Sequence, residues 1–294
     1  MSLFDKQNLE NGDNSEANQA GRDVIKIKNE VNNYGISYKD VKEIFDDLLD
    51  LKFTEKIEES LKQASLNTQQ FFKELEIKLK DNIGQIVKEK FSDPDVIFDL
   101  SNAINITARK GSKINLNALT DLLITRLSRN SNEILDQVCS DAINIIPKLT
   151  KQQLDFLAIS FYLQHYKSPK VQTFSDLEFD VKKLNKFYLS IENMSGASRF
   201  LLLSYGLCLH SSTFSLDPFH IIAKRKKLSD YKEGSGNAKG FYIHNAPTTF
   251  ELLKIYDDQD GINYTITTVG DLIAIIHLNN EAPHLNIKIE EWIN

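Results

Sequence analysis

Four consecutive basic residues, Lys224 to Lys227, are the strongest candidate for a binding site in the chain. They follow Asp217-Pro218 and the mainly apolar segment Phe219-His220-Ile221-Ile222, a pattern typical of a short helix. Because cations interact favourably with the carbonyl end of a helix, a solvated helix end is one interpretation. Contact with an anionic ligand, either a nucleic acid or a phage polyanion, is the other. The candidate anion-binding residues are Lys224, Arg225, Lys226 and Lys227.

Imidazole and thiolate groups are the usual ligands of zinc, so the histidines and cysteines are the candidate metal ligands. No two histidines have the i, i+4 spacing of a helical zinc site, and the two cysteines lack the paired spacing of a structural one. Both cysteines lie among apolar residues, which favours a place in the core. We therefore predict no metal and no cofactor. The residues are His165, His210, His220, His244, His277 and His284, with Cys139 and Cys208.

Nucleophile and phosphate-loop motifs are also weak. The glycine-rich segment 234–240 lacks a preceding apolar strand and a following helix cap, which favours a loop over phosphate contact. Ser195-Gly196 is better interpreted as a helix start than as a nucleophile elbow. We predict no catalytic residues. A cryptic enzyme, such as a nuclease or nucleotide hydrolase, is an alternative with no motif behind it.

The composition bounds the class of protein. The 294 residues carry a net charge of -6 at pH 7, with 41% hydrophobic and 26% charged residues, as in an average globular protein. Nucleic-acid binding is disfavoured by the net charge. The start, Met1 to Lys6, has no secretion signal, and the longest apolar run, Phe200 to Leu209, is too short to cross a membrane. These features predict a cytoplasmic protein without a membrane partner.

The leader, Gln7 to Gly35, is rich in Asn, Gly and Asp, unlike the rest of the chain. Two glycine-led units are followed by the alternating segment 24–28, which favours short β-strands with turns. Because so short a unit cannot satisfy its own strand edges, copies from several chains would complete them. A disordered polar tail is the alternative. The predicted oligomerisation residues are Gly12, Asp13, Asn14, Ser15, Gln19, Gly21, Asp23, Val24, Ile25 and Ile27.

After Gly35 the pattern becomes helical. Ser37 and Asp40 form a capping-box arrangement, and proline is absent from Ser37 to about Lys90. We expect one long helix, or two joined near Asn67, with an exposed face of Glu and Lys as in a stalk or coiled coil. The predicted domains are a β-type oligomerisation element (1–35), a helical stalk (36–91), a helical bundle (92–212) and a C-terminal α+β element (213–294).

The body is predicted to be helical. Asp93-Pro94 starts the first helix, and four antiparallel helices with short loops are expected from Asp93 to Tyr166. The last of them opens with a capping box, Thr150 with Gln153. Further helices are expected over Ser175–Leu189 and Ala197–His210, the second central because it is apolar almost all round.

The C-terminal part has a mixed pattern. Short strands are predicted at 241–243, 261–266 and 285–289, and Thr267 or Thr268 is expected to cap a helix that runs through Leu278. The predicted fold class is thus mainly α, with an N-terminal β element, a long helix, an antiparallel bundle and a small C-terminal α+β element.

Several motifs carry a resemblance to a poorly characterised bacterial protein family. They are Gly12-Asp13-Asn14-Ser15, Gln19-Ala20-Gly21-Arg22-Asp23-Val24, the run from Gly35 to Lys42, Asp93-Pro94-Asp95-Val96, the run from Pro147 to Leu157, and the run from Tyr264 to Gly270. The resemblance covers most of the chain, and it implies no known activity or catalytic residues. The Gly-Asp-Asn-Ser element is also similar to prefixes of bacterial phage-defence proteins, which implies a defence-linked assembly.

The segment Tyr264 to Ile275 resembles the end of a winged-helix domain, in which a wing strand leads into a capped helix. Ile266 stands where that pattern has Leu, and no clearly basic recognition helix precedes it. A packing or protein-binding module is therefore favoured over DNA recognition.

These patterns together favour a non-enzymatic homo-oligomeric scaffold or sensor. Its partners would be other copies of itself and a protein or phage component. The alternatives are a nucleic-acid-binding regulator that uses the winged-helix-like segment, and a cryptic effector enzyme.

Overall fold

A computed structural model describes residues 51–168, 170–211, 217–231 and 238–293. The chain divides into two units, Met1–Thr54 and Glu55–Asn294, and the described residues belong almost entirely to the second. These residues are mainly helical, with twelve α-helices and one two-stranded sheet among them. The fold class is thus confirmed as mainly α. The β element predicted for residues 1–35 and the helix start predicted at Ser37 lie outside the described ranges.

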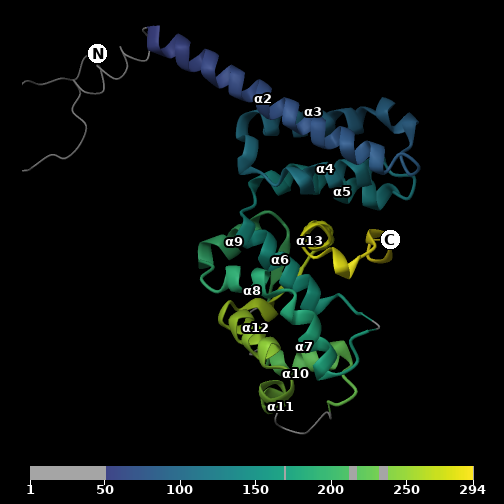
Figure 1. The fold of residues 1–294 in the computed structure, drawn as a ribbon, viewed down its shortest axis with the longest axis vertical. Helices are drawn as coiled ribbons and strands as arrows, with labels where there is room; N and C mark the ends of the chain where they lie inside the picture. Colours follow the sequence, from purple (N-terminus) through teal and green to yellow (C-terminus); the bar gives the residue numbers. More distant parts are fainter. Residues whose placement is uncertain (1–50, 169, 212–216, 232–237, 294) are drawn as a thin grey trace, which may run out of the picture. The chain divides into compact units, whose positions relative to one another are not determined.

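The first helices of the body pack together (Figure 1). Phe71 and Leu75 of the long helix are buried in the core, and Asn67 Nδ2 donates to the carbonyl oxygen of Ala108 at 3.0 Å. The long helix runs from Leu51 to Asp81 without a break, so it is one helix and not two joined near Asn67. The group consists of α2 (Leu51–Asp81), α3 (Pro94–Lys110), α4 (Leu116–Leu127) and α5 (Glu133–Ile145).

The end of α2 differs from the prediction. The helix stops at Asp81 instead of near Lys90, and the segment that follows pairs with the end of α4. Val87 N donates to Leu127 O at 2.9 Å, and Arg129 N donates to Gln85 O at 2.8 Å. Because Val87 N and the carbonyl oxygen of Gln85 find partners on another segment, nothing requires the helix to continue.

The predicted caps of this part are confirmed. The Asp93 side chain accepts a hydrogen bond from Asp95 N, with Pro94 at the first helical position. Gly111 ends α3 with a φ of 53°, which side chains other than glycine rarely adopt. Thr150 and Gln153 form the capping box that opens α6 (Lys151–Gln164).

Helix α6 is the central helix of the body, which corrects two predictions. It packs on α8 (Asn185–Ile191) and α13 (Thr268–Glu281) instead of completing a four-helix bundle with α3 to α5. All its residues from Gln153 to Gln164 are buried. Helix α13 contacts α4 and α5 as well as α6, so it joins the two groups of helices (Figure 1).

The helix predicted over Ala197–His210 is wrong in length and place. Helix α9 (Gly196–Ser204) buries only Leu202 among its side chains, and Gly206 (φ 70°) breaks it. The chain then forms β1 (Cys208–His210), which pairs antiparallel with β2 (Tyr264–Ile266). An apolar composition therefore does not make this helix central, because α6 and α13 occupy the core.

The remaining helices pack mainly on one another, with α12 (Pro247–Asp258) contacting α8 and α10 (Pro218–Lys226) contacting α6. The single helix predicted over Ser175–Leu189 is two helices, because the chain turns at Lys183 and buries Leu184. The strand predicted at 241–243 is helical, and the one at 285–289 consists of short turns around Asn286, whose φ is 45°. The other two helices of this group are α7 (Phe174–Lys182) and α11 (Ala238–Asn245).

The winged-helix resemblance is not confirmed. Thr267 caps α13 as predicted, with its Oγ1 accepting from Gly270 N at 3.3 Å. The helix that follows buries its residues from Leu272 to Leu278, whereas a recognition helix must expose its side chains to a groove. Among the described residues, every helix is too short or too polar to span a bilayer.

Candidate functional site

The two groups of predicted site residues have different outcomes. The predicted oligomerisation residues, Gly12 to Ile27, lie outside the described residues, so their role stays a prediction. Lys224 to Lys227 do lie at the end of a short helix, α10, as predicted. They do not share one face, because Lys226 is buried and the other three are exposed.

Lys226 binds the carbonyl end of α6. Its Nζ donates to the carbonyl oxygens of Tyr162 at 2.5 Å and Tyr166 at 2.7 Å, and lies 4.2 Å from the centre of the Tyr162 ring. Burial lowers the pKa of Lys226 to about 7. Lys226 is therefore partly a structural residue, and the surface cations of this segment are Lys224, Arg225 and Lys227.

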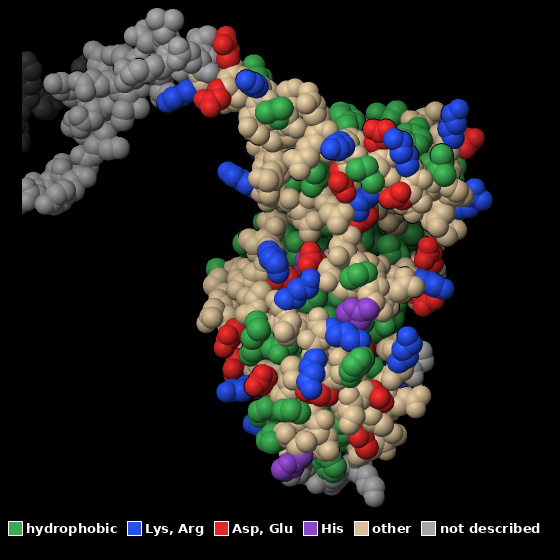
Figure 2. All heavy atoms as spheres, viewed as in Figure 1, with side chains coloured by type: hydrophobic (Ala, Val, Ile, Leu, Met, Phe, Trp, Pro, Cys, Tyr) green, Lys and Arg blue, Asp and Glu red, His purple; other side chains and the backbone are tan. Residues whose placement is uncertain are grey.

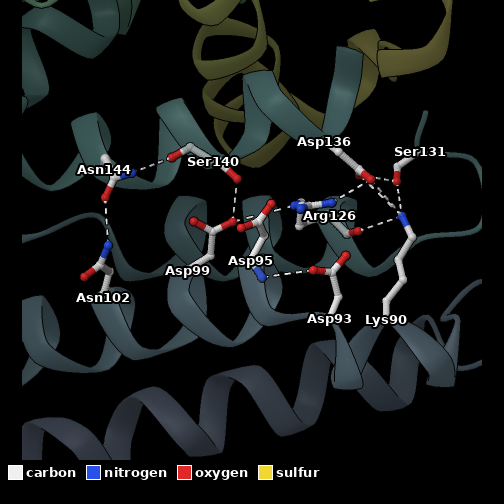
Figure 3. A network of polar contacts seen from close by, with 10 residues as sticks. All are labelled: Lys90, Asp93, Asp95, Asp99, Asn102, Arg126, Ser131, Asp136, Ser140 and Asn144. Carbon is white, nitrogen blue, oxygen red and sulfur yellow. Dashed lines mark hydrogen bonds and ion pairs between the residues drawn. The ribbon is translucent and has the colours of Figure 1, made fainter. Parts of the chain in front are cut away.

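A second polar cluster, the Arg126 network, lies where α3, α4 and α5 meet (Figure 3). Arg126 Nη1 lies 2.6 Å from Asp136 Oδ2, and its Nε lies 3.6 Å from Asp99 Oδ2. Lys90 Nζ donates to the carbonyl oxygen of Arg126 at 3.0 Å and lies 3.3 Å from Asp136 Oδ1. Arg126 and Asp99 are both buried, so their charges depend on these partners.

Hydrogen bonds extend the network along α3 and α5 (Figure 3). Ser140 Oγ donates to Asp99 Oδ2 at 2.6 Å, and Asn102 Nδ2 donates to Asn144 Oδ1 at 3.1 Å. Burial raises the pKa of Asp99, whereas Ser140 and Arg126 oppose that change. Burial is therefore the larger effect on this carboxyl group, and the two partners offset only part of it.

The Arg126 network borders a pocket of about 630 Å³. Five carboxylates line it together with Lys90 and Arg126, so its chemistry suits a cationic group. Arg126 and Lys90 already form ion pairs with Asp99 and Asp136, so the main effect of the network is to hold the helices together. In the part of the chain that the structure describes, no group of three or more His, Cys, Asp or Glu side chains is placed to hold a metal ion.

Three of the six histidines pair individually with acids, and these three pairs do not converge. Three pairs have short nitrogen to oxygen distances, 2.7 to 2.8 Å, and come from separate parts of the fold. The pairs are His165–Asp271, His210–Asp260 and His277–Asp155. Both cysteines are buried as predicted, and burial raises the pKa of each thiol to about 12, which makes them poor nucleophiles.

Asp155 is the centre of a buried polar group in the core. Its side chain is fully buried and accepts hydrogen bonds from Lys151 (2.5 Å) and Ser190, and it lies 2.8 Å from His277 Nε2. Asp155 is central here, whereas a catalytic triad places the histidine between the acid and the serine. The arrangement therefore ties α6, α8 and α13 together.

The third feature is an apolar stripe on α2, which we call the α2 stripe. Its spacing alternates between four and three residues, the repeat of a coiled coil. Phe71 and Leu75 are buried against the body, whereas Ile57 is 42% exposed and Leu61 is 65% exposed. Hydrophobic side chains reach the surface along α2 (Figure 2). The α2 stripe consists of Ile57, Leu61, Ala64, Thr68, Phe71 and Leu75.

The Arg126 network and the Asp155 group were not predicted from the sequence. A signal was present in both cases, because Arg126 interrupts the apolar run 122–127 and Asp155 lies between apolar residues of α6. A charged residue on the buried face of a helix requires a partner. The partners, Asp99 on α3 and His277 on α13, could not be identified without the packing of the helices.

A protein-family model described only as ":-like" matches residues 35–235, which is more than half of the chain. The description names no activity. The matched segment contains the Arg126 network and Lys226 but ends before α13. No curated protein and no solved structure matches the chain. By the family match, the chain belongs to this ":-like" family, with residues 35–235 as the shared part.

Proposed function

We propose that this protein is a non-enzymatic, homo-oligomeric scaffold or sensor linked to bacterial defence. In the proposed oligomer, the leader holds the subunits together and the long helix α2 contacts a neighbouring copy. The body binds a protein or phage component. The resemblance of Gly12-Asp13-Asn14-Ser15 to prefixes of phage-defence proteins supports the link to defence. The observation that best supports self-association is that part of the α2 stripe is buried against the body whereas the rest is exposed.

The α2 stripe is buried at its C-terminal end and exposed at its N-terminal end. Phe71 and Leu75 are buried, Ala64 and Thr68 are partly buried, and Leu61 is exposed. The pattern that packs α2 on its own body therefore continues where the body ends. Complete burial of one Leu or Ile side chain contributes about 1.5–3 kcal/mol, so the exposed half of the stripe favours a partner helix.

A second copy of the same helix fits this stripe. Of the three residues that flank Leu61 and Ile57 at coiled-coil contact positions, Ser60 and Ser65 are uncharged and Glu58 alone is charged. Two copies can therefore approach without opposing rows of like charges. The leader precedes this end of α2 in the sequence, so assembly of leaders would bring the exposed stripes together.

Leu61→Glu is the test of this proposal. The variant places a carboxylate on the stripe where α2 does not contact the body, so it is expected to lower the assembled mass toward that of one chain without unfolding the body. The measurement is light scattering on the full chain, with circular dichroism to verify helix content. Deletion of residues 1–35 is expected to lower the mass as well.

Leu66→Glu is the matched control. Leu66 lies on the same helix and is 50% exposed, and five residues place it about 140° away from Leu61 around the helix axis. It should keep the wild-type mass. A wild-type chain that is already monomeric contradicts the proposal, and so does a Leu61→Glu variant with unchanged mass.

A further inference from the structure

A small pocket near the ends of α6 and α10 is lined by cations without an acidic residue. Its volume is about 300 Å³. The residues that line it are Lys167, Ser168, Val171, Arg225, Lys226 and Lys227. In a chain whose net charge is -6, four basic side chains around one pocket are a local reversal of sign.

The carbonyl end of α6 does not account for all of these cations. Helix C-termini attract positive charge, and Lys226 already takes that place by donating to the carbonyl oxygens of Tyr162 and Tyr166. Lys167, Arg225 and Lys227 are exposed, and within the described ranges none of them forms an ion pair with a carboxylate. Beside the end of α6, these three cations are therefore not neutralised by a carboxylate of the described residues.

The cations also act on one another. Burial is the main cause of the lowered pKa of Lys226, about 7, and the charge of Lys167 lowers it further. Asp180 of α7 opposes both, while the rings of Tyr162 and Tyr166 face the ammonium from α6 and the residues after it. Lys167 and Lys226 thus repel each other across the pocket wall, and an anion between them would relieve that repulsion.

We propose that this pocket, hereafter the α6–α10 pocket, binds the phosphate group of a small ligand through Lys167, Arg225 and Lys227. Arginine and lysine are the side chains that bind phosphate oxygens, and Ser168 adds a hydroxyl at the same wall. The volume is at the lower end for small-molecule sites, which fits a phosphate group with a small attached moiety. The site is separate from the α2 stripe and does not depend on self-association.

Calorimetric titration of inorganic pyrophosphate into the full chain at low salt tests the proposal. The triple variant Lys167→Gln, Arg225→Gln, Lys227→Gln is expected to bind about tenfold more weakly or worse, because charge-assisted hydrogen bonds to the anion are lost. All three side chains are exposed, so the fold should persist. A single-stranded oligonucleotide is titrated in parallel to distinguish a small phosphate ligand from a nucleic acid.

A charge-matched control separates a site from the effect of net charge. Lys88→Gln, Lys113→Gln, Lys254→Gln removes the same three charges at exposed positions outside the pocket and should leave pyrophosphate affinity within about twofold, as expected for distant surface changes. Equal weakening in both triple variants overturns the proposal. Absence of pyrophosphate binding by the wild type at millimolar concentration also overturns it, and binding of the oligonucleotide alone assigns the pocket to nucleic acid instead.

Discussion

Replacing Arg126 by methionine is expected to lower the free energy of unfolding by about 3–5 kcal/mol, the range for removing one partner of a buried ion pair. Asp99 is 2% exposed, and without Arg126 its remaining polar partner in the network is Ser140. Asp136 keeps Lys90, so the loss should come mainly from Asp99. Urea unfolding of the full chain, followed by circular dichroism, measures the change.

Adding Asp99→Asn to the Arg126→Met variant identifies the cause of the lost stability. If an uncompensated buried carboxylate destabilises Arg126→Met, removing that charge should restore part of the lost stability in the double variant. Arg109→Met is the matched control, because Arg109 is exposed near the end of α3 and should change stability by about 0.5 kcal/mol or less. Equal losses for Arg109 and Arg126, or no recovery with Asp99→Asn, would disprove this role of the network.

Asp155→Asn is expected to lower the free energy of unfolding by about 3 kcal/mol at neutral pH, because buried His277 and the ammonium of Lys151 lose the carboxylate that pairs with them. Burial alone would raise the pKa of Asp155. Hydrogen bonds from His277, Lys151 and Ser190 outweigh that effect and lower it below its ordinary value. The ionised carboxylate is therefore the form that the fold stabilises.

The sign of the pH dependence follows from this lowered pKa. A group whose pKa is lower in the folded chain contributes its stability above its unfolded pKa, about 4 for Asp, and loses it as the pH falls through the folded value. The stability difference between wild type and Asp155→Asn should therefore be largest near neutral pH and shrink below about pH 4. Urea unfolding at a series of pH values measures it, with exposed Asp141→Asn as the control. A difference that stays constant with pH would be inconsistent with this role of Asp155.

Local signals predicted the helix boundaries best. The caps at Asp93, Thr150 and Thr267 are confirmed, because each depends on hydrogen bonds within a few residues. The predictions were wrong for segments with competing local preferences. Residues 241–243 have strand-like side chains but lie in α11, where burial of Tyr242 in the core determines the structure.

Long-range arrangement was less predictable. The chain order of helices suggested that α6 completes a bundle with α3 to α5, yet α6 packs on α13, more than a hundred residues away. The arrangement of the residues at the candidate sites was also hard to predict. Lys224 to Lys227 were visible as a cluster of like charges, but the inward turn of Lys226 depends on the position of the α6 carbonyl oxygens. Asp99 and Arg126 had no visible relation until the two helices were placed side by side.

The position of α13 has a consequence for biosynthesis. This helix touches α4, α5 and α6, yet it follows α6 in the sequence by more than a hundred residues, at Thr268–Glu281. A ribosome-bound nascent chain therefore exposes the apolar surface that α13 will cover until Thr268–Glu281 has left the ribosome, and during that interval it is vulnerable to proteases and in need of chaperones. A premature stop codon ahead of Thr268 would make that exposure permanent, so truncated products should be degraded instead of accumulating.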